Sequence, residues 1–103
     1  MRRTYPLRLT INGRLINKII IDSHYEAKHS KTINDGLILE LIKGLNGKTH
    51  EAESISTEGW EIYVNDPLFL GEKPYRLIWC LHPDEDSVGV INAFRRSNGK
   101  VSK

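Results

Sequence analysis

Apolar and polar residues alternate along the first part of the chain, a pattern typical of strands with one buried face. Two apolar-rich runs are separated by Asn12 and Gly13. Asn-Gly between such runs is a strong hairpin signal, because both residues tolerate the positive φ that a tight turn requires. The sequence therefore predicts a two-stranded hairpin over residues 5–21.

The following segment carries helical signals. Ser23 is a good N-cap and Glu26 stands three residues later, as in a capping box, so a short helix is predicted over residues 24–29. Thr32 offers a second cap. Apolar residues then recur at helical spacing, which predicts a core-facing helix over residues 33–45. These apolar residues are Ile33, Leu37, Ile38, Leu41, Ile42 and Leu45.

The second half of the chain has the period of strands. Residues 74–82 form a predicted strand, and residues 87–96 form the last one. In the first of these, the alternating positions are Tyr75, Leu77, Trp79 and Leu81 on one face and Arg76, Ile78, Cys80 and His82 on the other. Residues 60–70 indicate a strand that Pro67 interrupts, since proline cannot donate to a ladder. Residues 51–56 are either a short strand or a loop. In the last strand, the alternation places Val88, Val90 and Phe94 on one face and Ile91 and Ala93 on the other.

These elements predict an α+β fold. An N-terminal β-hairpin is followed by two helices and then by a three- or four-stranded antiparallel meander, with the helices packed on one face of the sheet. We expect a single domain over residues 1–103, with a folded core over residues 1–96 and a flexible tail over residues 97–103.

Composition narrows the class of protein. The chain has 103 residues, and no apolar run approaches the roughly 20 residues that a membrane-spanning helix needs. The N-terminus lacks the long apolar region of a signal peptide. Cys80 is the one cysteine, so no internal disulfide is possible and a reducing cytoplasm is the expected setting. We expect no membrane partner.

The charge is unevenly distributed, although its net value is only +2. Residues 1–32 hold seven basic and two acidic residues, residues 33–73 hold three basic and eight acidic, and residues 74–103 are again mainly basic. If the fold joins the two ends, one face is basic and suits a polyanion. Otherwise the charges are scattered and only keep the protein in solution.

Several residues have the types that chemistry on a phosphate needs. His24 is expected in the first turn of its helix, where the imidazolium is disfavoured and a neutral ring can accept a proton. Lys28 lies four residues later, on the same helix face. Arg95 and Arg96 close the last strand, and successive strand residues point to opposite sides. A polar helix edge and strand-edge arginines that oppose aggregation are the plain alternatives.

Metal and cofactor chemistry are not indicated. His24 and His29 are five residues apart, which is not a helical ligand pair. The acidic run Asp84, Glu85 and Asp86 is typical of a solvated turn. We therefore expect no metal and no cofactor.

The early His24 with Lys28 four residues later, the strand Tyr75–Trp79 and a last strand running through Phe94 into arginine resemble the RelE/ParE/BrnT-like toxin superfamily. This group has the small ribonuclease fold of barnase and RelE, and the likeness is to an uncharacterised branch. The resemblance covers residues 21–96. It implies a toxin-like, metal-independent endoribonuclease of a toxin–antitoxin system, with RNA as substrate and an antitoxin protein as partner.

The resemblance also implies roles for individual residues. His24 would be the base or acid, Lys28 and Arg95 or Arg96 would hold the phosphate, and Tyr75 or His82 would transfer the second proton. We also expect Arg96, Arg76 and His29 to contribute to RNA binding. The alternative is a non-catalytic interaction or accessory protein of the same fold that binds a protein or nucleic acid. Inhibition of DNA gyrase, as by ParE-like toxins, is a more distant possibility.

Overall fold

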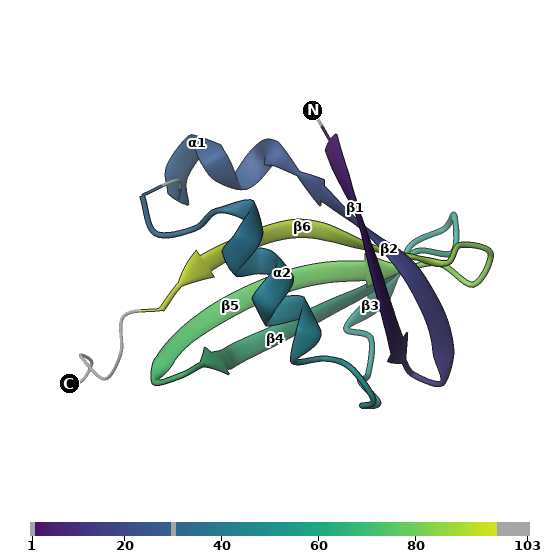
Figure 1. Cartoon of the computed structure of the whole chain (residues 1–103). Helices are drawn as coiled ribbons and strands as arrows, with labels where there is room; N and C mark the ends of the chain where they lie inside the picture. The colour runs from purple at the N-terminus through teal and green to yellow at the C-terminus, as the bar shows by residue number, and fades with distance from the viewer. Residues whose placement is uncertain (1, 30, 97–103) are drawn as a thin grey trace.

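The computed structural model describes residues 2–29 and 31–96, so the predicted tail over residues 97–103 lies outside the described residues. Six strands dominate this part of the chain (Figure 1). The strands are β1 (Arg2–Ile11), β2 (Arg14–Asp22), β3 (Ser54–Ile55), β4 (Glu61–Leu70), β5 (Lys73–Leu81) and β6 (Ser87–Arg95). The helical elements are the 3-10 turn η1 (Ser23–Tyr25), α1 (Glu26–His29) and α2 (Asp35–Lys43).

All six strands belong to one mixed sheet, in the order β1-β2-β6-β5-β4-β3. Neighbouring strands are antiparallel except β2 and β6, which are parallel and place Ile21 opposite Val90. The predicted α+β architecture, in which two helices pack on one face of a three- or four-stranded antiparallel meander that follows the hairpin, is therefore wrong. The hairpin and the later strands form one six-stranded mixed sheet, and the helices in residues 2–29 and 31–96 are short. The parallel pairing joins segments far apart in the sequence, and no local pattern encodes it.

Local signals set the turns and the helix ends. Asn12 and Gly13 have φ values of 55° and 74° and connect β1 to β2 as a hairpin. The short helix predicted over residues 24–29 is present as a 3-10 turn, η1, followed directly by one α turn, α1. The N-cap of α2 is Asn34 instead of Thr32, because the Asn34 side chain accepts the Leu37 backbone N–H at 2.8 Å.

The core lies between α2 and one face of the sheet (Figure 1). α2 buries Ile38, Leu41 and Ile42, which are part of the predicted apolar stripe. Trp79 of β5 is 0% exposed and stacks on Tyr63 of β4, with ring centroids 4.2 Å apart. The alternation predicted for β5 is thus confirmed. Its odd-numbered residues from Tyr75 to Leu81 face the core, and the residues between them face the opposite, outer side of the sheet.

A bulge in β6 changes which side chains reach the core. Val90 pairs with Trp79, but Asn92 pairs with Ile78, so Ile91 is an extra residue in β6. Ala93 is therefore buried on the same side as Val90, and the predicted faces of the last strand are wrong beyond this point. A bulge of one residue reverses the alternation that follows it.

The outer face of the sheet is unusually apolar. An antiparallel sheet with one covered face commonly carries polar residues on the other. Here half-buried or exposed apolar side chains continue across four strands. They are Ile20, Ile62, Val64, Ile78, Cys80 and Ile91.

Gly89 leaves room for the Cys80 thiol on this outer face. A Cβ atom at position 89 would lie 2.8 Å from the Cys80 Sγ atom, closer than such atoms approach. We expect Gly89→Ala to lower the free energy of unfolding by about 1–3 kcal/mol, as overpacking does. Urea denaturation of Gly89→Ala, Cys80→Ala and the double variant measures this. The interpretation fails if the double variant is no more stable than Gly89→Ala.

Candidate nucleic-acid interface

A pocket of about 620 Å³ lies where β6 ends beside the β4–β5 hairpin. Tyr75 and Arg95 are directly opposite each other in the β5–β6 ladder, and both line the pocket. Leu37 of α2 forms another part of the wall, so the pocket lies on the helix side of the sheet. The remaining lining residues belong to the hairpin end, namely Leu70, Gly71, Glu72 and Lys73.

The pocket has the groups that an anion needs. Lys73 and Arg95 are exposed cations at its rim, and Glu72 is the one carboxylate among the described residues that line it. Tyr75 is 4% exposed, and within residues 2–29 and 31–96 no hydrogen bond occupies its hydroxyl group. Because Tyr75 also lines the pocket, this hydroxyl is available to a ligand. Arginine and lysine beside a free hydroxyl suit a phosphate group.

The other two arginines of this region bind a carboxylate of the protein itself. Arg76 donates from Nη1 to the Asp66 carboxylate at 2.8 Å, and Nε of Arg96 lies 3.2 Å from the same carboxylate. The Arg96 backbone N–H also donates to the Pro74 carbonyl at 2.9 Å. Arg95 and Arg96 therefore diverge, and the structure places Arg95 at the pocket.

The first helical segment lies beside the strand that ends at Arg95. Because β2 runs parallel to β6, the chain beyond Asp22 continues along β6 towards the end of that strand. Both η1 and α1 contact β6. η1, which contains His24, and α1, which contains Lys28, therefore lie beside β6, the strand that ends at Arg95. The exposed residue Lys28 does not itself line the pocket. The side chains of His24 and His29 lie outside the described part of the structure.

Asp35 fixes η1 against β1 and α2. Its carboxylate accepts Arg3 Nε at 2.5 Å, Arg3 Nη2 at 2.9 Å, the Tyr5 hydroxyl at 2.5 Å and the Tyr25 hydroxyl at 2.7 Å. The hydrogen bonds from Arg3 hold the pKa of Asp35 well below its usual range. Burial, with the hydrogen bond to Asp35, raises the pKa of Tyr25 to about 12. Glu26, predicted as a capping residue, also pairs with Arg3 at 3.2 Å.

His82 lies at the opposite end of β5 from Tyr75. The two residues are seven positions apart along an extended segment, about 23 Å at the usual rise of a strand, so His82 does not reach the pocket. Its Nδ1 atom accepts the Asp84 backbone N–H at 3.0 Å, and its Nε2 atom lies 2.8 Å from the Glu58 carbonyl oxygen. Nε2 therefore carries the proton and donates it. The ring also packs edge-on against Trp60, at a centroid distance of 4.9 Å.

Lys73 is the pocket residue that the sequence interpretation missed. It stands two residues before Tyr75, and strand residues two apart point to the same face. The spacing of two residues between Lys73 and Tyr75 was the signal in the sequence that could have identified Lys73. In the part of the chain that the structure describes, no cluster of three or more His, Cys, Asp or Glu residues has the arrangement of a metal site.

Comparison of the chain with protein-family models, with curated proteins and with solved structures finds no match. The resemblance to the RelE/ParE/BrnT-like toxins therefore stays a prediction from the sequence. The fold itself defines a small protein with a six-stranded mixed sheet and one helix of more than a single turn in residues 2–29 and 31–96. Within those ranges, the helices are all too short or too polar to cross a bilayer.

Proposed function

We propose that this protein is a toxin-like endoribonuclease that holds an RNA phosphate in the pocket of Tyr75, Arg95 and Lys73. The observation that supports this is the register of β5 and β6, which puts a free hydroxyl group opposite a guanidinium in one pocket. The proposal includes the cytoplasm as its location and an antitoxin protein that neutralises it.

In the proposed reaction, the ribose 2′-hydroxyl attacks the adjacent phosphorus atom. A base removes the hydroxyl proton, the P–O bond to the 5′ oxygen breaks, and an acid protonates that oxygen, which leaves a 2′,3′-cyclic phosphate. His24 is one of the two proton-transfer groups and Tyr75 is the other, since His82 is distant. Lys28 and Arg95 stabilise the additional negative charge on the phosphate in the transition state.

Cleavage of labelled single-stranded RNA in the presence of a chelator tests this proposal. We expect His24→Ala, Arg95→Ala and Tyr75→Phe to lower the cleavage rate by about 100-fold or more, the usual contribution of such groups. Arg8→Ala is the matched control, because Arg8 is exposed on β1 away from the pocket. An RNA with a 2′-deoxyribose at the cleavage position must resist. Absence of cleavage by the wild-type protein overturns the enzymatic proposal.

A non-catalytic role in binding is the second candidate. It is favoured by the position of His82, whose ring is held by the Glu58 carbonyl and the Asp84 backbone N–H away from the pocket. Tyr75 is then the one predicted proton-transfer residue whose described side chain lines the pocket. This role predicts that RNA binds without being cleaved and that Arg95→Glu weakens binding, measured by fluorescence anisotropy. If the wild-type protein neither cleaves nor binds RNA, both candidates fail.

A further inference from the structure

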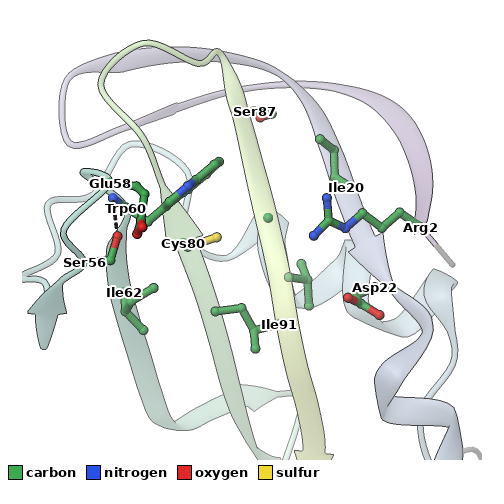
Figure 2. A pocket seen from close by; sticks show the side chains of 12 residues that line it. Arg2, Ile20, Asp22, Ser56, Glu58, Trp60, Ile62, Cys80, Ser87 and Ile91 are labelled. Carbon is green, nitrogen blue, oxygen red and sulfur yellow. Dashed lines mark hydrogen bonds between the residues drawn. The ribbon is translucent and has the colours of Figure 1, made fainter.

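A second pocket of about 620 Å³ lies on the outer face of the sheet, away from the pocket of Tyr75 and Arg95. We name this surface the outer patch. Its apolar middle consists of Ile20, Ile62, Cys80 and Ile91, from four neighbouring strands. Figure 2 shows the Cys80 sulfur in the centre, Arg2 reaching in from one side, and Glu58 and Trp60 on the opposite side.

The charges of the outer patch do not suit a nucleic acid. Among the described residues that line it, Arg2 is the one cation, whereas Asp22 and Glu58 are both carboxylates. A phosphate backbone would meet more negative than positive charge there. The apolar middle instead resembles the centre of a protein–protein interface, where charged residues are depleted and a charged rim surrounds them. Ile91, the bulged residue of β6, is 37% exposed at this position.

The arrangement of the rim is self-complementary. Arg2 and Glu58 are both exposed, and they stand at opposite margins of the apolar middle (Figure 2). Consider a two-fold axis that lies in the plane of the interface, passes near Cys80 and is perpendicular to the line from Arg2 to Glu58. Rotation about this axis lays the Arg2 margin of one copy over the Glu58 margin of the other. In such an isologous interface each contact occurs twice. Opposite charges on the two margins are what a second copy of the same chain requires. A partner of another kind would not require this arrangement.

We propose that the outer patch is the interface of a symmetric homodimer, in which two sheets pack face to face. Arg2 of each copy pairs with Glu58 of the other, and the two apolar middles bury each other. This proposal does not depend on RNA cleavage, because the pocket of Tyr75 and Arg95 lies on the other side of the sheet.

Sedimentation velocity over a range of protein concentrations tests the proposal. We expect the wild-type chain to be dimeric at high concentration. Arg2→Glu and Glu58→Arg should each weaken the dimer by about tenfold or more, because each creates two like-charge contacts. A mixture of the two variants should restore association as a heterodimer, since both of its contacts then join opposite charges. Matched controls are Arg8→Glu and Glu51→Arg, exposed positions outside the outer patch.

The apolar middle gives an independent variant. Ile91→Asp should abolish the dimer and leave the circular dichroism spectrum unchanged, because residue 91 is a bulged surface position. A wild-type chain that is monomeric at every concentration overturns the proposal, whatever else the outer patch binds. A dimer that survives both charge reversals and Ile91→Asp uses another face and also overturns it. Failure of the mixture to associate excludes the two-fold pairing of Arg2 with Glu58.

Discussion

Asp35→Asn is expected to lower the free energy of unfolding by about 2–3 kcal/mol, the usual cost of losing charge-assisted hydrogen bonds and leaving a buried donor unpaired. The carboxylate accepts hydrogen bonds from Arg3, Tyr5 and Tyr25, and the Tyr25 side chain is buried. An asparagine has one acceptor oxygen and brings two donors into a site that holds only donors. Arg3 is partly exposed and regains water, which limits the cost.

Urea denaturation at neutral pH measures this effect. Glu40→Gln on the same helix is the matched control, because Glu40 forms an exposed ion pair with Lys43 at 2.9 Å. Such surface pairs contribute about 0.5 kcal/mol or less. Equal effects of the two substitutions would contradict the assignment of Asp35 as the residue that ties η1 to β1 and α2.

The pH dependence of this difference has a definite sign. The folded-state pKa of Asp35 is lowered, chiefly by the hydrogen bonds from Arg3. Its carboxylate therefore contributes its full stabilisation at every pH well above the unfolded-state pKa. That unfolded value is about 3.9 for aspartate. The stability difference between wild type and Asp35→Asn should therefore shrink as the pH falls below about 4. A difference that stays constant between neutral and strongly acidic pH would contradict this account.

The features predicted correctly are those encoded by neighbouring residues. Asn12-Gly13 supplies both positive-φ positions of its turn within two residues. The alternation of Tyr75, Leu77, Trp79 and Leu81 identifies the core face of β5 without knowledge of its partners. These signals are local, and the contacts of the rest of the fold do not change them.

The sheet topology depends on contacts that no local signal carries. Ile21 pairs with Val90 across most of the chain, and this parallel pairing merges the hairpin with the later strands. The bulge at Ile91 is a second example, because one extra residue moves each later side chain of β6 to the opposite face of the sheet. Without the bulge, the faces predicted for Ala93 and Phe94 would have been correct.

In the candidate site, too, features set by local strand geometry were predicted, and features set by the pairing of distant strands were not. Opposite faces for Arg95 and Arg96 followed from strand geometry alone, and the structure separates them between the pocket and Asp66. The pairing of Arg95 with Tyr75 needed the register of β5 and β6, which the sequence does not give. His82 shares a face with Arg76, but their separation along β5 is about 20 Å, too far for one site.

Trp79→Ala is expected to be the most destabilising single substitution proposed, at about 3–5 kcal/mol, because it leaves a large cavity in the core. Trp79 is 0% exposed, stacks on Tyr63 and meets the edge of the His50 ring at a centroid distance of 5.3 Å. Trp60→Ala is the control, since Trp60 is only half-buried at the sheet margin. A cost no greater than that of Trp60→Ala would show that the core is not centred on Trp79.

The indole N–H contributes separately from the ring. It donates to Oδ1 of Asn65 at 2.7 Å, across the β4–β5 ladder. Trp79→Phe removes this donor and leaves the Asn65 oxygen without its partner, which costs about 1–3 kcal/mol beyond the lost volume. In an Asn65→Ala background, Trp79→Phe should therefore cost less than in the wild type, by an interaction energy of about 0.5–3 kcal/mol in a double-mutant cycle. Strict additivity of the two substitutions would mean that the hydrogen bond adds nothing, and that Trp79 stabilises the fold through packing alone.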